Sequence, residues 1–256
     1  MKVLILAGGF GTRLNDETDL RPKPMVEIGG RPILWHIMKI YSKYGYNDFV
    51  LLLGYKGYLI KEFFFNYFLH NNDVKIDLKN NKISYLGNDS EPWDVTLLDT
   101  GLNTMTGSRI KKAKKYLENE KFFLTYGDGV ANLNMKEQLL FHDSHDGIIT
   151  MTAVQPHGRF GVFDQEPSGK VNRFTEKPAG DGSWINGGYF ICEPDIFKYI
   201  PQGEEVVFEN EPLSNLAKEG KLYSYKHHGF WKCMDTLRDK NELDNLAKKD
   251  KIPWLI

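Results

Sequence analysis

The chain opens with MKVLILAGGFGTRL (residues 1–14), in which the apolar run from Lys2 to Leu6 leads directly into glycines at positions 8, 9 and 11. A short, continuously apolar run is typical of a strand that is buried on both faces. Glycines after such a strand let backbone N–H groups approach a phosphate closely, and Arg13 adds a fixed fork of donors. The stretch therefore predicts a phosphate-binding loop, with a simple tight turn as the alternative.

The glycine spacing excludes two common nucleotide-binding motifs. It does not match G-x-x-x-x-G-K-[ST], so a P-loop is excluded. It also fails G-x-G-x-x-G, because Leu14 stands where the last glycine belongs. A dinucleotide-dependent dehydrogenase is therefore disfavoured.

Outward from the first strand, strand and helix patterns alternate. Pro32 opens a helix with apolar residues at the 3.6 period, and Phe49–Leu53 reads as a second buried strand. A helix is predicted over 58–69, a hairpin over 74–86 and a core strand over 122–126. This order predicts an α/β fold: a Rossmann-like, doubly wound, mainly parallel mixed sheet with small antiparallel insertions.

Smaller predictions concern single side chains. Thr106 is expected to cap a helix reaching Leu117, and Thr236 to cap the last helix in a capping box with Asp239. His142 and a histidine three residues later, without a third ligand, are expected on a solvated helix face.

Composition excludes several classes of protein. The chain has 256 residues, with 33 Lys and Arg against 34 Asp and Glu. This balance argues against non-specific binding to nucleic acid or membrane. Two cysteines cannot form a disulfide framework or a four-thiolate zinc site. The apolar stretch Val3–Ala7 is too short for a signal peptide, so a cytoplasmic location is expected.

LAGGFGTRL (6–14) followed by RPKPM (21–25) resembles the signature of the sugar-nucleotide pyrophosphorylases, nucleotidyltransferases that join a sugar 1-phosphate to a nucleoside triphosphate. Further matches cover essentially the whole chain: YGDG (126–129), EKP (176–178), INGGYF (185–190) and WKCMDT (231–236). The resemblance implies one nucleotidyltransferase domain over 1–256. Its nucleotide-binding part would span about 1–130 and its sugar-phosphate-binding part about 131–256.

Within the family, three stretches resemble the members that transfer the cytidylyl group of CTP to α-D-glucose 1-phosphate: residues 23–45, 91–101 and 105–109. The implied products are CDP-glucose and pyrophosphate, and CDP-glucose would be a precursor of CDP-linked deoxysugars in bacterial surface polysaccharides. The resemblance also implies Mg²⁺ as the cofactor and assembly into a homo-oligomer. Uridylyl or thymidylyl transfer remains an alternative, although those relatives carry a different loop over 99–109. A non-catalytic nucleotide-sugar sensor is a third, and it would be expected to lose phosphate- or metal-binding groups.

The resemblance also assigns residues to roles. Asp128 and Asp235 would bind the metal, whose preferred ligands are oxygens; taken alone, they could be a turn residue and a helix cap. Arg13 would bind the β,γ-phosphates, and Lys23 the α-phosphate and the sugar phosphate. The predicted nucleotide-binding residues are Leu6, Ala7, Gly8, Gly9, Phe10, Gly11, Thr12, Arg13, Lys23, Thr104, Arg109 and Asp128. The predicted sugar-phosphate-binding residues are Glu176, Lys177, Asn186 and Gly187.

Choosing cytosine over uracil requires an acceptor facing N4 and a donor reaching N3 or O2. The loop from Asp99 to Arg109 offers the Thr104 hydroxyl or backbone carbonyls as acceptors and Arg109 as a donor. The alternative for Arg109 is a surface charge at the start of a helix.

Overall fold

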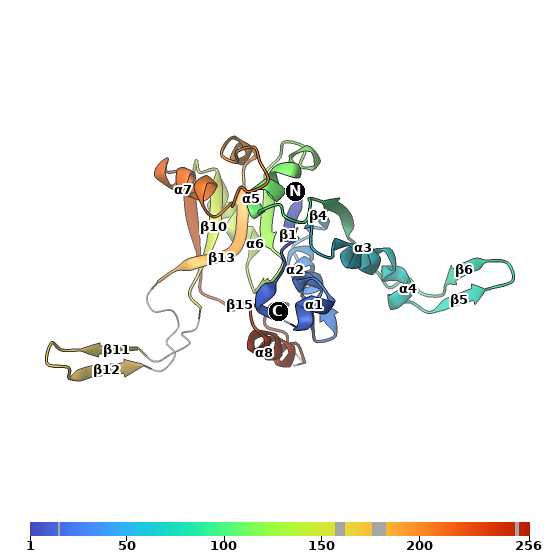
Figure 1. Ribbon diagram of the computed structural model, residues 1–256, viewed down its shortest axis with the longest axis horizontal. Coiled ribbons are helices and arrows are strands. Elements are labelled where there is room, and N and C mark those ends of the chain that lie inside the picture. Colours follow the sequence, from blue (N-terminus) through green and yellow to red (C-terminus); the bar gives the residue numbers. More distant parts are fainter. Residues whose placement is uncertain (15, 157–161, 176–182, 249–250) are drawn as a thin grey trace.

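The computed structural model describes residues 1–256 except 15, 157–161, 176–182 and 249–250. Its centre is a seven-stranded mixed sheet in the order β14-β10-β13-β8-β1-β4-β7 (Figure 1). The strands are β1 (Val3–Ala7), β4 (Asp48–Leu53), β7 (Asp94–Asp99), β8 (Phe122–Tyr126), β10 (Ile149–Val154), β13 (Ile185–Cys192) and β14 (Leu222–His227). Only β13 runs antiparallel to its neighbours, β8 and β10, among the paired strands of this sheet.

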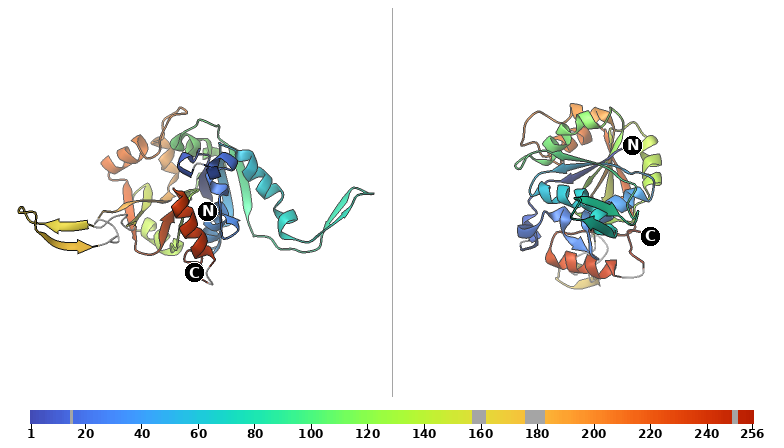
Figure 2. Two further views of the ribbon diagram at one scale, coloured as in Figure 1. Left: turned by 60° about the horizontal axis from the view of Figure 1, so that its bottom comes forward. Right: turned by 90° about the vertical axis from the view of Figure 1, so that its right-hand side faces the viewer.

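Helices cover both faces of the sheet (Figure 2). On one face, Val3, Ile5 and Ala7 of β1 join a core with α2 (Ile33–Ser42), while on the other Leu4 and Leu6 join a core with α5 (Thr106–Lys112). Two-sided burial explains why β1 is apolar throughout. The first face also receives α6 (Met135–Asp143) and α8 (Leu237–Ala247), and the second receives η4 (Pro194–Lys198) and α7 (Glu211–Lys218). The predicted fold class is confirmed.

Smaller elements lie around the sheet. A hairpin of β5 (Val74–Asp77) and β6 (Lys82–Tyr85) projects beyond α3 (Gly57–Phe65) and α4 (Tyr67–Asn71), as Figure 1 shows. The remaining elements are η1 (Thr12–Leu14), α1 (Asp16–Leu20), η2 (Lys23–Met25), β2 (Glu27–Ile28), β3 (Arg31–Pro32), η3 (Lys114–Tyr116), β9 (Gly129–Ala131), β11 (Val162–Gln165), β12 (Val171–Thr175) and β15 (Trp231–Cys233).

Three local predictions are wrong and one is confirmed. The helix expected over 58–69 is broken at Asn66 into α3 and α4. Met105, not Thr106, is the N-cap of α5, because the Thr106 hydroxyl is hydrogen-bonded to another segment, and α5 stops at Lys112. His142 is buried, with Nδ1 2.8 Å from Thr150 Oγ1. Thr236 forms the predicted capping box at the start of α8.

The parallel strands place four loops at one edge of the sheet. β1 pairs in parallel with β4 on one side and with β8 on the other, and β4 pairs in parallel with β7. The carboxyl ends of these strands therefore lie side by side, where ligands bind in open α/β sheets. This edge carries the loops after residues 7, 53 and 99 and the segment Gly127-Asp128.

Candidate active site

The loop after β1 contacts the ends of neighbouring elements. Gly8 O accepts hydrogen bonds from Tyr55 N at 3.1 Å and from Arg109 Nη2 at 3.0 Å. The chain turns at Gly11, whose φ of +66° favours glycine, and enters η1. The glycine-rich segment is thus fixed at its base at the carboxyl edge.

Most of the residues predicted to bind the nucleotide lie in this loop or immediately before it. Leu6 and Ala7 are the last residues of β1, and Gly9 and Phe10 are exposed beyond its end. Thr12 begins η1 directly after the loop. The side chain of Arg13 lies outside the part of the chain that the structure describes.

Lys23 and the two predicted metal ligands meet at one point. Lys23 Nζ lies 2.6 Å from Asp128 Oδ2 and 2.6 Å from Asp235 Oδ1. The Lys23 side chain is 13% exposed, and the two carboxylates are 26% and 31% exposed. Residues from η2, the end of β8 and the end of β15 therefore form one partly buried charged cluster.

Backbone pairing between two short strands brings Asp128 and Asp235 together. β9 follows Asp128 and pairs antiparallel with β15, with Cys233 opposite Gly129. Met234 N donates to Asp128 O at 2.8 Å. This small ladder holds the two carboxylate-bearing segments side by side although they are remote in sequence.

The charges within this cluster determine the protonation of Lys23. Burial lowers the pKa of the ammonium group, but the charge of Asp128 and hydrogen bonds to Asp128 and Asp235 raise it by more, so the pKa lies well above its ordinary value. Lys23 is therefore cationic throughout the physiological pH range.

The same cluster can hold a divalent cation. Ligand atoms of Asp128, Cys233 and Asp235 lie within 4.8 Å of one another. Lys23 Nζ, a cation, already contacts both carboxylates, which shows that they converge on a position suited to positive charge. Two carboxylates suit an oxygen-preferring ion such as Mg²⁺. The donor set therefore fits the metal that the resemblance implies.

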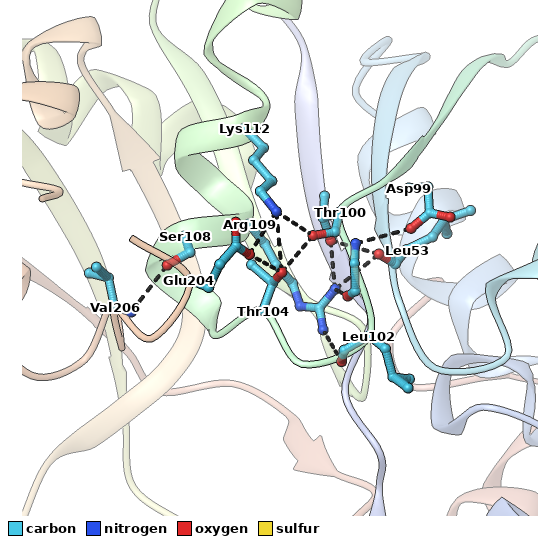
Figure 3. A network of polar contacts seen from close by, with 11 residues as sticks. Leu53, Asp99, Thr100, Leu102, Thr104, Ser108, Arg109, Lys112, Glu204 and Val206 are labelled. Atoms are coloured by element: carbon cyan, nitrogen blue, oxygen red, sulfur yellow. Dashed lines mark hydrogen bonds and ion pairs between the residues drawn. The ribbon is translucent and has the colours of Figure 1, made fainter. Parts of the chain in front are cut away.

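The loop over 99–109 is folded tightly at the end of β7. Thr104 is 5% exposed, and its hydroxyl is hydrogen-bonded to Thr100 O at 2.6 Å and to Glu204 Oε2 at 2.5 Å. Glu204 also binds Lys112 Nζ at 2.7 Å (Figure 3). Through Glu204, the segment near residue 204 thus fixes the loop over 99–109 by contacts from a different part of the chain.

Arg109 lies beneath this loop and is not a surface charge. Its Nη1 donates to Leu53 O at 2.9 Å and to Gly101 O at 2.8 Å, and its Nη2 donates to Leu102 O at 3.1 Å (Figure 3). Nη2 also donates to Gly8 O in the loop after β1. The residue is 4% exposed. A Cβ on Gly8 would lie 2.4 Å from Nη1, so glycine is needed there for the guanidinium to pass. Arg109 thus connects three loops of the carboxyl edge.

The described part of the predicted sugar site lies on β13. Asn186 Oδ1 accepts from Gly188 N at 2.8 Å, and Nδ2 donates to Tyr126 OH at 3.3 Å. A Cβ on Gly187 would lie 2.8 Å from Val154 Cγ1, so packing against β10 already requires glycine there. The predicted residues Glu176 and Lys177 lie outside the described residues.

The structure adds residues that sequence reasoning did not assign to the site. Tyr126 and Cys233 stand within the motifs YGDG and WKCMDT, so their motif positions were the available signal. Glu204 and Glu209 contact Thr104 and Thr106 respectively, across about 100 positions of sequence. No local pattern marks those two glutamates.

Comparison with known proteins identifies the family. Residues 2–239 match the family described as Nucleotidyl transferase. The chain belongs to the nucleotidyl transferase family. This nucleotidyl transferase is 51% identical over 255 residues to glucose-1-phosphate cytidylyltransferase of Salmonella typhi, covering 99% of this chain and 98% of the relative. It is 32% identical to a mannose-1-phosphate guanyltransferase of Aspergillus oryzae, covering 95% of this chain and 62% of that protein.

Solved structures show the same fold. A UDP-glucose pyrophosphorylase complexed with UDP-glucose superposes on this nucleotidyl transferase with a TM-score of 0.68 at 17% identity, covering 98% of this chain and 99% of the other. Among the described residues, none of the helices combines the length and the apolar character needed to cross a membrane.

Proposed function

We propose that this nucleotidyl transferase transfers the cytidylyl group of CTP to α-D-glucose 1-phosphate and releases CDP-glucose and pyrophosphate. The observation that carries the proposal is the convergence of Lys23, Asp128 and Asp235 beside a glycine-rich loop at the carboxyl edge. The 51% identity to a glucose-1-phosphate cytidylyltransferase supports the choice of base and sugar.

The proposed reaction is a single displacement. A phosphate oxygen of glucose 1-phosphate attacks the α-phosphorus of CTP, the new P–O bond forms, and the bond to the β-phosphate oxygen breaks with pyrophosphate leaving. No base is needed to activate the attacking oxygen, because a phosphate monoester with a second pKa of about 6 is already ionised at neutral pH. The protein must instead align two anions and offset their charge.

Each residue of the cluster is assigned a separate role in this reaction. Lys23 would sit between the α-phosphate and the sugar phosphate, with the flanking Pro22 and Pro24 limiting its backbone freedom. Asp128 and Asp235 would hold the divalent cation, proposed to be Mg²⁺. When bound, that cation offsets charge on the triphosphate. Arg13 would hold the departing β,γ-phosphates.

The base and the sugar are assigned to different parts of the chain. Residues 1–130 would bind the nucleotide, with Thr104 and Arg109 in the loop that selects cytosine; residues 131–256 would bind the sugar phosphate through Glu176, Lys177, Asn186 and Gly187. Since both Nη atoms of Arg109 donate to backbone carbonyls, the geometry supports a role in shaping the loop. Direct contact with the base would require some of these bonds to be exchanged.

The proposal includes a cytoplasmic location, where nucleoside triphosphates are available, and assembly into a homo-oligomer. The projecting hairpin supports assembly, because Ile76, Ile83 and Tyr85 are exposed on it. The product would enter the synthesis of CDP-linked deoxysugars.

The test is pyrophosphate release with glucose 1-phosphate and CTP, UTP, dTTP, ATP or GTP in parallel. We expect CTP to be preferred over UTP by about ten- to a hundredfold, since an unpaired buried polar group costs ~1–3 kcal/mol. A preference for UTP or dTTP would replace the proposal with uridylyl or thymidylyl transfer. Binding without turnover would indicate a sensor.

A further inference from the structure

The carboxylate of Glu209 accepts hydrogen bonds from two hydroxyl groups, which belong to distant parts of the chain. Tyr126 OH donates to its Oε1 at 2.5 Å, and Thr106 Oγ1 donates to its Oε2 at 2.8 Å. Tyr126 is the last residue of β8, and Thr106 is the first residue of α5. Glu209 itself precedes α7, so one carboxylate joins three elements.

The polarity of these hydrogen bonds is determined at each step. An ionised carboxylate only accepts, so the single proton of the Tyr126 hydroxyl is directed at Glu209. The Tyr126 oxygen must then accept from its other neighbour, Asn186 Nδ2, at 3.3 Å. The opposite end of the same amide, Oδ1, accepts from Gly188 N at 2.8 Å. Two contacts therefore orient Asn186 in the same sense: Gly188 N fixes Oδ1 as the acceptor end, and the Tyr126 oxygen, whose proton is directed at Glu209, accepts from Nδ2.

The ring of Tyr126 is held independently of this chain of bonds. A Cβ on Gly188 would lie 2.6 Å from Tyr126 Cδ2, so the ring packs directly on the glycine backbone. Removing the carboxylate would therefore leave the ring in place. Only the hydroxyl proton of Tyr126 would lose its acceptor and become free to point elsewhere. That proton could then point at Asn186 Nδ2, so that two donors face each other. Because Gly188 N holds Oδ1, the amide cannot relieve this contact by inverting, and its NH2 end would be displaced.

We propose that Glu209 is a positioning residue for the sugar: it directs the Tyr126 proton away from Asn186, so that the Tyr126 oxygen accepts from Nδ2 and holds the amide in one place for a hexose 1-phosphate. This inference rests on the proposed function, which places Asn186 at the sugar. A displaced amide would no longer meet a sugar hydroxyl at hydrogen-bonding distance, so one bond to the sugar would be weakened or lost.

The experiment compares the wild-type protein with Glu209→Gln, Tyr126→Phe, the double variant and Glu205→Gln. Glu205 is an exposed glutamate of the same segment and serves as the matched control. The Michaelis constants for glucose 1-phosphate at saturating CTP, and for CTP at saturating glucose 1-phosphate, are measured together with thermal melts.

We expect Glu209→Gln and Tyr126→Phe each to raise the Michaelis constant for glucose 1-phosphate by about tenfold, with that for CTP changed by less than about twofold. The double variant should be no worse than either single variant, because both break the same chain of bonds. Glu205→Gln should match the wild type. If Glu209→Gln fails to fold, Tyr126→Phe alone must show the sugar-specific effect.

Three outcomes would overturn the inference: additive effects in the double variant, an unchanged Michaelis constant for glucose 1-phosphate, or an equal rise in the Michaelis constants for both substrates. In each case an active wild-type protein would leave the proposed function standing. A wild-type protein that releases no pyrophosphate from any of the nucleotides would overturn both.

Discussion

Lys23 Nζ lies 2.6 Å from Asp128 Oδ2, although 105 positions of sequence separate the two residues. A second carboxylate, that of Asp235, binds the same ammonium group at 2.6 Å. The cation offsets repulsion between two carboxylates that the β9–β15 ladder holds close together. Substrate phosphates and a divalent cation would compete for these same bonds, so the cluster is expected to rearrange during the reaction.

Replacing either carboxylate of this pair by its amide should abolish most activity. Asp128→Asn and Asp235→Asn are each expected to lower turnover by at least about 100-fold, because a neutral amide is a much poorer ligand for Mg²⁺. Turnover across a Mg²⁺ titration, with thermal melts as a check on folding, measures the effect. Near-normal turnover in both folded variants would remove these residues from the metal site.

Removing the charge of Lys23 should affect the chemical step more than nucleotide binding. Lys23→Met keeps the length of the side chain and leaves two carboxylates facing each other. We expect single-turnover rates to fall by more than the affinity for CTP, since Lys23 is proposed to contact both substrates. Loss of CTP affinity with an intact chemical step would contradict this assignment.

Arg109→Leu separates two roles for that residue. A leucine removes the guanidinium bonds that tie the carbonyls of Gly8, Leu53 and Leu102 to one side chain, although Gly8 O and Leu53 O keep backbone donors. The melting temperature should therefore fall, and binding of CTP and UTP should weaken together. The CTP/UTP ratio should stay nearly constant if the side chain only shapes the loops. A ratio that shrinks by about tenfold would instead show that Arg109 itself reads the base.

The stability of the fold should fall in mild acid because of His36. Trp254 Nε1 donates to His36 Nδ1 at 3.2 Å, and His36 Nε2 faces Ile28 O at 2.8 Å, so the buried neutral ring is already fully bonded. Burial lowers the pKa of His36 to about 4, from an ordinary value of 6.5. Between these values the unfolded chain binds more protons than the folded one, so the free energy of unfolding decreases as the pH falls from 6.5 towards 4.

The expected loss from this histidine is roughly 3 kcal/mol across that window. Urea unfolding at a series of pH values measures it, and His36→Gln should reduce the slope between pH 6.5 and 4. Equal slopes for the variant and the wild type would rule out His36 as the source.

The two cysteines should differ in reactivity. Burial raises the pKa of both thiols, and the negative charge of Asp128 raises that of Cys233 further. Alkylation at pH 7.5 should therefore be slow, with the half-buried Cys233 labelled before the fully buried Cys192. Labelling of Cys233 should stop turnover, because its sulfur lies within 4.8 Å of the Asp128 and Asp235 oxygens. Mass spectrometry with activity assays tests the order, and faster labelling of Cys192 would contradict it.

The sequence by itself determined the sheet and the positions of its main chemical groups. Two-sided burial forces β1 and residues Phe49–Leu53 of β4 to be continuously apolar, and this pattern is visible in one sequence. Glycines at positions 8, 9 and 11 predict the loop that follows β1. The capping box of Thr236 and Asp239 is also local, since both bonds lie within one turn of helix.

Only the tertiary structure decided which distant groups share a hydrogen bond. Thr106 fits a helix cap by its sequence, yet its hydroxyl binds Glu209 because a segment about 100 residues later packs against α5. Arg109 fits a surface charge at a helix start, yet it is buried beneath three loops that β1, β4 and β7 bring to one edge. Local sequence patterns show helix or strand propensity and hydrophobic periodicity. The partner of a buried polar group depends instead on which strands lie side by side, and the packing of the whole sheet determines the strand order.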